Sequence, residues 1–176
     1  SVHEFVKKRE PLRQAVGIQS LLDGIQALIE LQARQSYVSY QTDIPADLPA
    51  VRADRVMIEQ VLLNLTRNAI EAMQHIPPQR RMLNVVAEYD AATAQVSVAV
   101  IDQGHGIPDD VAERLFSPFF STKAEGMGMG LNICRTAIEF HGGSLTHSAN
   151  PQGGTIFTFV LPAVPAAAEQ ERSEEH

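Results

Sequence analysis

EQVLLNLTRNAIEAM, residues 59–73, spaces its apolar side chains at the three- and four-residue intervals of an amphipathic helix. Pro77 and Pro78 follow this stretch and cannot continue a helix. The pattern therefore predicts a long helix from about Asp54 to His75. Strand-like runs follow this helix, which indicates a domain in which helices pack on a sheet.

Four polar side chains lie on one face of the predicted helix: Asn64, Asn68, Glu71 and His75, at positions i, i+4, i+7 and i+11. Such a stripe is typical of a solvent-facing side. Surface helices normally carry Lys, Glu or Arg there, because these residues form helices better than asparagine does. Two asparagines one turn apart also present carbonyl oxygens, which suit a Mg²⁺ ion that already carries phosphate oxygens. The helix alone is compatible with a solvent face and with a ligand site.

The rest of the chain alternates between helix-like and strand-like segments. Helices are predicted at 21–34 and 131–141, and strands at 37–43, 83–89, 96–101, 144–149 and 155–161. Residues 103–130 form one long loop with a helical turn at 111–115, and loops of this length in compact domains are usually functional. This order predicts an α/β fold: a two-layer α/β sandwich with a mixed, mostly antiparallel sheet and helices on one face.

The composition restricts the possible functions. The 176 residues carry a net charge of -7, which argues against a dedicated surface for nucleic acid or anionic membranes, since both need clustered Lys and Arg. No stretch approaches the apolar length of a membrane span, and we expect a cytoplasmic location. The single cysteine, Cys134, lies in an apolar helical run, so we expect a buried, inert thiol. The histidines show no zinc-binding spacing.

GMGMGL, residues 126–131, places glycines at alternate positions at the start of the last predicted helix. The segment lacks the pattern of a P-loop, and it fails the dinucleotide fingerprint because Leu131 stands where the last glycine belongs. Two interpretations remain: a flexible hinge, or an anion site made by free N–H groups at a helix start. Lys123, just upstream, is either a phosphate contact or a solvated lysine.

Asp102 ends an apolar strand and enters a loop through Gly104 and Gly106. A carboxylate at a strand end can accept a hydrogen bond from a ligand amine, and the glycines would let a flat ring approach the backbone. Aspartate and glycine are also the residues that ordinary turns use. Both interpretations stand on this segment alone.

Taken together and in order, these segments resemble the ATP-binding catalytic (HATPase) domain of sensor histidine kinases, in the GHKL ATPase superfamily. NLTRNAIEA (64–72) resembles the family's N box, DQGHGIP (102–108) the first glycine box, LFSPFFSTK (115–123) the F box, GMGMGL the second glycine box and GGTIFTFVLP (153–162) the last. The match spans roughly residues 21–162. The chain is most similar to the nitrogen- and oxygen-sensing class of these kinases, because it combines the strings RNAIEAM and PFFSTKAEGMGMGLNICRTAIEFHGG.

This resemblance implies a Bergerat-type sandwich that holds Mg-ATP between the long helix and the long loop. Asn68 would bind Mg²⁺ with help from Asn64, and Asp102 would accept a hydrogen bond from the adenine amine. Three phenylalanines would anchor the loop as a lid over ATP: Phe116, Phe119 and Phe120. The implied ATP-binding residues are Asn64, Asn68, Glu71, Ala72, Asp102, Gly104, Gly106, Ile107, Phe116, Phe120, Thr122, Lys123, Gly126, Gly128, Met129, Gly130, Leu131 and Thr155.

The resemblance also bears on the mechanism. ATP-hydrolysing relatives of the gyrase and Hsp90 type place a glutamate, the general base for water, where this chain has Asn64, and an amide cannot act as that base. We therefore expect ATP to be held for a histidine imidazole on a separate dimerisation helix, with Asn64 and Lys123 as the catalytic residues. Glu71 stands where many family members carry Lys or Arg, so Lys123 or Arg67 is the candidate cation for the phosphates.

Three regions are expected along the chain: a stub of the preceding dimerisation helix and linker at 1–16, the ATP-binding catalytic domain at 17–162, and a disordered acidic tail at 163–176. His3, in the string HEF, is similar to the family's phosphorylated His-Glu pair. No helical hairpin fits after it, so we expect the phosphoacceptor histidine outside this chain.

The expected partners are the kinase's own dimerisation and phosphoacceptor domain and a downstream response regulator, with no nucleic acid and no direct membrane contact. The chain itself is expected to be monomeric and its parent homodimeric. Two alternatives are a GHKL-type serine kinase of the anti-sigma class and a nucleotide-binding pseudokinase module.

Overall fold

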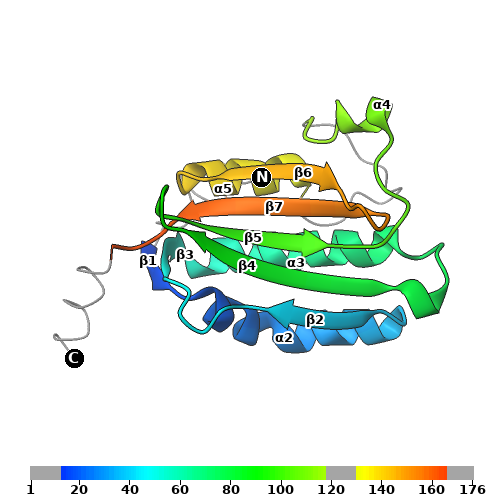
Figure 1. Ribbon diagram of the computed structural model, residues 1–176, viewed down its shortest axis with the longest axis horizontal. Helices are drawn as coiled ribbons and strands as arrows, with labels where there is room; N and C mark the ends of the chain where they lie inside the picture. Colours follow the sequence, from blue (N-terminus) through cyan, green and yellow to red (C-terminus); the bar gives the residue numbers. More distant parts are fainter. Residues whose placement is uncertain (1–12, 118–129, 166–176) are drawn as a thin grey trace.

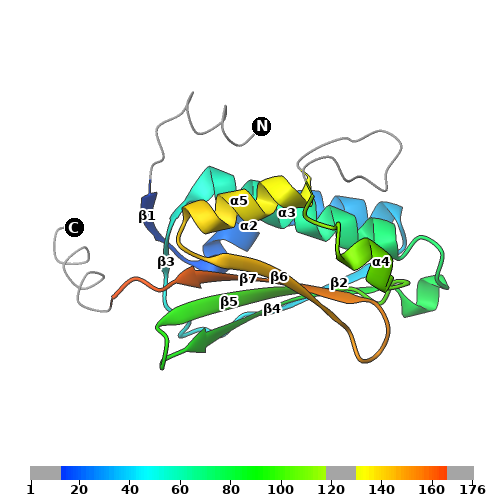
Figure 2. The same ribbon diagram turned by 90° about the horizontal axis from the view of Figure 1, so that it is seen from above.

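A computed structural model of the protein describes residues 13–117 and 130–165, and these form two layers (Figure 1, Figure 2). One layer is a five-stranded sheet in the order β2-β4-β5-β7-β6, and helices α2, α3 and α5 cover one of its faces. The elements in chain order are β1 (Arg13–Val16), α2 (Ile18–Gln35), β2 (Ser39–Asp43), β3 (Val51–Asp54), α3 (Arg55–Ala72), the 3-10 turn η1 (Pro78–Arg80), β4 (Met82–Asp90), β5 (Gln95–Ile101), α4 (Asp109–Ala112), α5 (Leu131–Phe140), β6 (Ser144–Ala149) and β7 (Thr155–Pro162).

The predicted fold class is confirmed by the sheet. Strand β2 pairs parallel with β4, and every other neighbouring pair in the sheet is antiparallel. Alternate residues of β5 are buried under the helices, namely Val96, Val98 and Val100, because successive side chains of a strand point to opposite faces. The predicted hairpin between the two central strands is also present, with Asp90 opposite Gln95.

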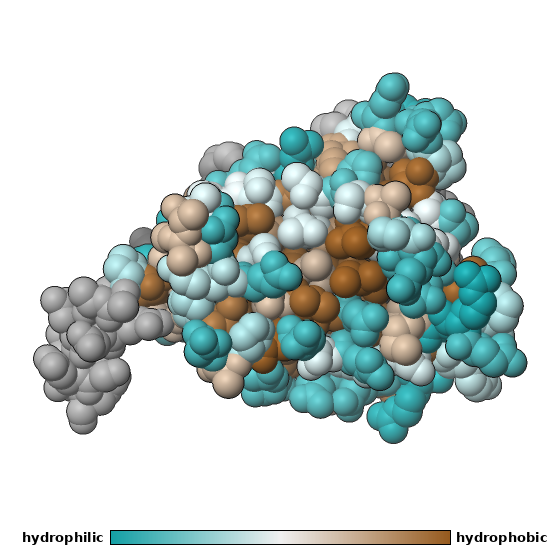
Figure 3. Space-filling view, viewed as in Figure 1, coloured by the Kyte–Doolittle hydropathy of each residue, from teal (hydrophilic) through white to brown (hydrophobic). Residues whose placement is uncertain are grey.

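The face of the sheet away from the helices carries mixed side chains (Figure 3). Cross-strand neighbours on this face include the apolar pairs Val86–Ala99 and Ile101–Ile156, all of which are half-buried. Apolar patches are therefore visible between polar side chains in the centre of this view. The described part of the chain contains no helix that is long and apolar enough to cross a membrane.

Helix α3 begins as the sequence predicts and ends earlier. Asp54 caps it, since its carboxylate oxygen Oδ1 accepts hydrogen bonds from the N–H groups of Val56 at 3.1 Å and Met57 at 3.3 Å. The helix ends at Ala72, and His75 lies in a turn beyond it. The turn is tighter than a helix, as the bond from Ile76 N to Met73 O shows.

Two short strands are absent from the sequence prediction. Strand β1 pairs antiparallel with β3, with Arg13 opposite Asp54 and Val16 opposite Val51. Each is only four residues long, too short for an alternating pattern to emerge from the sequence. Residues 13–16, predicted to belong to the linker, are thus part of the fold. At the other end the Val164 N–H bonds to Ala50 O at 2.8 Å, so the fold also continues past residue 162.

A buried histidine joins the start of α3 to the end of α5. His141 accepts a hydrogen bond at Nε2 from the Asp54 N–H at 3.1 Å, so Nδ1 carries the proton and donates to Ala137 O at 2.7 Å. On the exposed side, Arg13 donates to Phe140 O at 2.6 Å and stacks over the Phe140 ring. Burial lowers the pKa of His141 below its ordinary value of 6.5.

This histidine should make the stability depend on pH. The unfolded chain takes up a proton at His141 near pH 6.5, whereas the folded chain resists protonation, so the unfolded state binds more protons and the free energy of unfolding falls as the pH drops below 6.5. Urea unfolding between pH 7.5 and 5.5 measures this slope. His141→Gln should flatten it, and His75→Gln, the same change in an exposed turn, should keep it. An unchanged slope in His141→Gln would contradict the assignment.

Candidate functional site

The site is built around Asp102, the first residue after β5. Its side chain is 1% exposed, and its Oδ1 accepts hydrogen bonds from the N–H groups of Gly104 at 2.9 Å and Thr155 at 3.1 Å. Its backbone N–H bonds to Thr155 O at 3.0 Å, which extends the β5–β7 pairing by one step. Neither of the two carboxylate bonds uses Oδ2. Within residues 13–117 and 130–165, this leaves Oδ2 as a further acceptor at the edge of the sheet.

Burial raises the pKa of the Asp102 carboxyl above its ordinary value of 3.8, while the bonds from Gly104 and Thr155 and the nearby His105 act in the opposite direction. A desolvated carboxylate gains more from a hydrogen-bond donor than an exposed one does. A neutral amine group on a ligand would supply such a donor. The chemistry of Asp102 thus fits an amino-substituted ring.

Two glycines bring the backbone close to Asp102. A side chain at Gly104 would collide with the Ala72 backbone, with its Cβ 2.8 Å from Ala72 C, so the first glycine box packs directly on the end of α3. Gly154 has φ +103°, and a Cβ there would lie 2.7 Å from Asp102 Oδ1. Gly106 has φ +79°, which glycine adopts without strain. The loops around Asp102 therefore require glycine for their shape.

The polar stripe of α3 divides into a buried and a half-buried part. Asn64 is 7% exposed and faces α5, where its Nδ2 donates to Cys134 Sγ at 3.2 Å. Its Oδ1 accepts from Arg67 Nη2 at 2.6 Å. Asn68 and Glu71 are half-buried one and two turns further on. Cys134 is buried, as predicted, and that its thiol is inert stays a prediction.

Helix α5 presents its N-terminus at the same end of the domain. Gly130 is its N-cap residue and makes no side-chain cap, and the first turn holds no acidic residue. The Gly130 carbonyl accepts from Ile133 N and Cys134 N, both at 3.1 Å. Leu131, the first residue of α5, is half-buried against the core. Within the described residues, this helix start has no side-chain cap, and helix N-termini of this kind favour anions.

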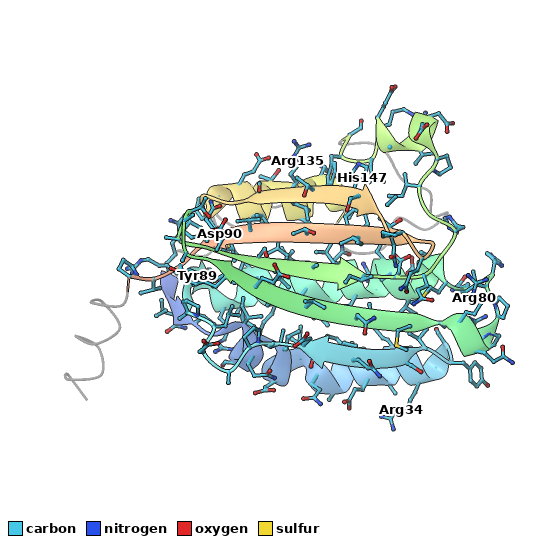
Figure 4. All side chains as sticks on the ribbon, in the orientation of Figure 1. Arg34, Arg80, Tyr89, Asp90, Arg135 and His147 are labelled. Atoms are coloured by element: carbon cyan, nitrogen blue, oxygen red, sulfur yellow. The ribbon has the colours of Figure 1, made fainter. Side chains whose placement is uncertain are left out.

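Phe116 contacts one side chain of α5 and one of β6, Arg135 and His147, and Figure 4 labels both of these partners. Arg135 of α5 lies over its ring at 4.9 Å, and the His147 ring of β6 is 6.0 Å away, centre to centre. Ile107 and Phe116 both pack against the core. The role predicted for Phe116, as an anchor of the loop, stays a prediction.

The structure brings together most of the predicted residues that it describes. Asp102, Gly104 and Thr155 are in direct contact, Ala72 touches Gly104, and Gly106 and Ile107 continue the same loop. Seven predicted residues lie outside the described residues: Phe119, Phe120, Thr122, Lys123, Gly126, Gly128 and Met129. His3 lies outside them as well.

Three residues of the site are absent from the sequence-based set. Asn150 donates from Nδ2 to Asp102 O at 2.9 Å, Gly154 packs on the Asp102 carboxylate, and Cys134 bonds to Asn64. Gly154 belongs to the last glycine box, so the sequence motif could have predicted that it lies in the site. Asn150 and Cys134 act through contacts across 48 and 70 residues, and no local pattern marks such pairs.

Comparison with known proteins identifies the family. Residues 53–165 match the model described as "Histidine kinase-, DNA gyrase B-, and HSP90-like ATPase". The chain belongs to this ATPase family. The resemblance found in the sequence is thereby confirmed, and membership implies that the domain binds ATP.

Sensor proteins are among the relatives of this ATPase domain. The C4-dicarboxylate transport sensor protein DctS of Rhodobacter capsulatus is 46% identical over 161 residues, which cover 92% of this chain and 24% of DctS. The sensor protein FixL of Bradyrhizobium diazoefficiens is 42% identical over 162 residues, which cover 92% of this chain and 32% of FixL. The chain thus spans about a quarter to a third of the length of these relatives.

Solved structures of the histidine kinase ThkA share the fold. Its nucleotide-free catalytic domain has a TM-score of 0.74 and 32% identity, and the match covers 86% of this chain and 95% of that domain. ThkA in complex with the response regulator TrrA has a TM-score of 0.72 and 30% identity, over 93% of this chain and 46% of that one. The fold of this chain is therefore that of a histidine kinase catalytic domain.

Proposed function

We propose that this chain binds Mg-ATP and donates the γ-phosphate to a histidine on a separate dimerisation domain of a two-component sensor kinase. The buried carboxylate of Asp102 carries the proposal. Its Oδ1 is fixed by Gly104 and Thr155, and Oδ2 is left as an acceptor for the adenine amine. Guanine has a carbonyl oxygen at the corresponding position, so this geometry favours adenine over guanine.

The phosphates would extend from this pocket toward the half-buried face of α3 and the N-terminus of α5. The free N–H groups at the start of α5 would hold phosphate oxygens, which the helix dipole favours. Asn68 would supply a carbonyl oxygen to Mg²⁺, and a neutral hard ligand suits an ion that already carries phosphate oxygens. Mg²⁺ supplies charge neutralisation on the β- and γ-phosphates when bound.

The reaction moves the terminal phosphoryl group from ATP to an imidazole nitrogen. The N–P bond forms as the P–O bond to ADP breaks, the electron pair of that bond stays on ADP, and the imidazole proton leaves to solvent. This chain's residues position the nucleotide and neutralise charge. Asn64 cannot abstract a proton from water, which agrees with a domain that keeps ATP for another acceptor.

The relatives support the sensor-kinase setting of this proposal. DctS and FixL are sensor proteins, and ThkA is known in a complex with its response regulator. We propose the same kinds of partner here: a dimerisation domain that carries the acceptor histidine, and a response regulator that takes the phosphoryl group from it. The similarity to FixL supports the predicted nitrogen- and oxygen-sensing class.

A reconstitution experiment tests the function. The chain is mixed with Mg-ATP labelled at the γ-phosphate and with a separately supplied dimerisation segment from a related sensor kinase. We expect phosphohistidine on that segment, recognised by its lability in acid and stability in alkali, and no label on this chain alone. Binding of Mg-ATP by calorimetry is the parallel measurement, and a chain inert to ATP and its analogues would refute the proposal.

A further inference from the structure

The hydrogen bonds between Asp102 and Thr155 depart from the regular ladder of an antiparallel sheet. Opposite residues in a hydrogen-bonded antiparallel pair normally exchange two backbone N–H···O bonds. Asp102 makes the first of these, from its N–H to Thr155 O at 3.0 Å. The return bond from the Thr155 N–H goes to the side chain of Asp102, to Oδ1 at 3.1 Å. The strand partner of Asp102 therefore holds its carboxylate.

A side chain supplies the donor for the backbone carbonyl of Asp102. Asn150, in the turn between β6 and β7, donates from Nδ2 to Asp102 O at 2.9 Å. Buried backbone carbonyls need such a partner, and in a regular ladder the Thr155 N–H would be that partner. Because Asn150 satisfies the carbonyl, the Thr155 N–H serves the carboxylate.

The turn between β6 and β7 fixes the orientation of Asn150. Its backbone N–H donates to Gly154 O at 3.0 Å, and its backbone carbonyl accepts from the Gly153 N–H at 2.9 Å. Its side-chain Oδ1 accepts from the Gln152 N–H at 3.2 Å, which is the bond of an Asx turn. With Oδ1 engaged in this way, the amide group points its Nδ2 at Asp102.

The peptide group between Asp102 and Gln103 is bonded at its other end as well. The Gln103 N–H lies 3.5 Å from the sulfur of Met73, a fully buried residue directly after α3. A thioether is a weak acceptor, so this contact adds less than the bond from Asn150 does. Because a peptide group is planar, partners at its N–H and at its carbonyl together set the direction in which the chain leaves β5.

We infer that Asn150 is a positioning residue for the adenine-binding carboxylate and acts through the backbone carbonyl of Asp102. The inference rests on the proposed function, in which Asp102 accepts a hydrogen bond from the adenine amine. Without the Asn150 donor, the Thr155 N–H would return to the carbonyl, as in a regular ladder, and Oδ1 would lose one of its two bonds. The carboxylate would then turn away from the amine. Asn150 therefore controls selectivity for the amino group of the base.

The experiment compares two ligands that share the phosphates and differ in the amine. Calorimetry measures the affinities of the chain for Mg-ATP and for the magnesium complex of purine riboside triphosphate, which carries hydrogen in place of the amine. Asn150→Ser keeps an oxygen for the Gln152 N–H, but its hydroxyl is too short to reach Asp102 O. We expect the ratio of the two affinities to fall about 3- to 10-fold, the size of a neutral hydrogen bond, through weaker binding of Mg-ATP alone.

A second variant and a control accompany this substitution. Asn150→Asp keeps the shape of the side chain and the acceptor for Gln152, but it cannot donate, so the ratio should fall at least as far as in Asn150→Ser. Its added charge acts on the phosphates of both ligands and cancels in the ratio. Asn84→Ser makes the serine change at a half-buried asparagine on the face of the sheet away from the helices, and it should leave the ratio unchanged.

A double substitution tests whether Asn150 acts through Asp102. In the background of Asp102→Asn the carboxylate is already absent, so adding Asn150→Ser should change the ratio by less than about 2-fold. A residue that contacted the base directly would lower the ratio by the same factor in both backgrounds. An equal fall in both backgrounds would therefore overturn the inference.

The outcomes separate the inference from the function on which it rests. Failure of the unmodified chain to bind Mg-ATP would refute the proposed function. Equal binding of the two triphosphates by the unmodified chain would refute recognition of the amine, and the inference with it. An unchanged ratio in Asn150→Ser and Asn150→Asp would overturn the inference alone. Equal losses for both ligands, with a lowered urea midpoint, would also overturn it, since they would show a purely structural role.

Discussion

Asp102→Asn should abolish adenine recognition while the domain stays folded. Asparagine keeps an oxygen for the N–H groups of Gly104 and Thr155, and it places an amide donor where Oδ2 faces the ligand. The asparagine Nδ2 would then face the adenine amine. Both groups are donors, so the charge-assisted hydrogen bond is lost and each of the two is left without an acceptor. We expect Mg-ATP affinity to fall by about 100-fold or more, measured by calorimetry.

The free energy of unfolding of Asp102→Asn should not fall with its affinity for Mg-ATP; it should stay the same or rise. Folding raises the pKa of Asp102, so the folded state binds more protons than the unfolded state above pH 3.8, and the ionised carboxylate lowers stability at neutral pH. The neutral amide removes this cost, and the urea midpoint of Asp102→Asn at pH 7.5 should be equal to or above that of the unmodified chain. The preference for ATP over GTP should also narrow, because the amide can donate to the guanine carbonyl.

Asp54→Asn serves as the control for this result. It makes the same change at another fully buried aspartate, the N-cap of α3, and asparagine is also a good cap. Mg-ATP affinity should stay at the unmodified level. If Asp102→Asn bound Mg-ATP normally, or lost affinity only in step with a falling urea midpoint, the adenine-binding role of Asp102 would be refuted.

Gly154→Ala should be far more damaging than Gly153→Ala, although the two glycines are adjacent and have φ values of +103° and +101°. Either alanine has an unfavourable backbone conformation, which costs about 1–3 kcal/mol. Only at residue 154 would the new Cβ also meet protein atoms, 2.7 Å from both Asp102 Oδ1 and Gln103 Cα, whereas nothing lies within 4 Å at residue 153. Overpacking of this kind adds about 1–3 kcal/mol.

Urea unfolding and nucleotide binding measure the two consequences. The free energy of unfolding should fall further in Gly154→Ala than in Gly153→Ala, and the difference between the two should equal the cost of overpacking. It should also weaken Mg-ATP about 10-fold or more, because the carboxylate must move. Gly153→Ala should bind nucleotide like the unmodified chain once both are compared in the folded state. Equal effects of the two substitutions would show that backbone strain alone, and not contact with Asp102, explains the need for Gly154.

Local signals in the sequence predicted the long elements and the centre of the site. Helix α3, its capping residue Asp54 and the β4–β5 hairpin follow from side-chain periodicity and turn chemistry, which act within a few residues. The strand predicted from Tyr37 begins instead at Ser39. Tyr37 has φ +57° and belongs to the turn after α2, and no periodic pattern reveals a left-handed tyrosine.

For the site too, the sequence predicted some features and the tertiary structure added others. Ordered motifs predicted that Asp102 and the N-box asparagines serve one ligand, and the fold brings the Asp102 loop onto the end of α3 at Gly104. The polar stripe of α3 alone was compatible with solvent or ligand. Packing rules out the solvent face for Asn64, which is buried against α5, and its role toward a ligand stays a prediction.

The sequence by itself determined the fold class and the family, and it predicted the residues proposed to bind the adenine, because periodicity and ordered motifs are local properties of the chain. Only the tertiary structure decided the partners of those residues. Cys134 meets Asn64 across 70 residues, Thr155 meets Asp102 across 53, and His141 meets Asp54 across 87. The packing of helices on the sheet creates these contacts, and hydrogen bonds between buried groups then fix the orientation of each side chain.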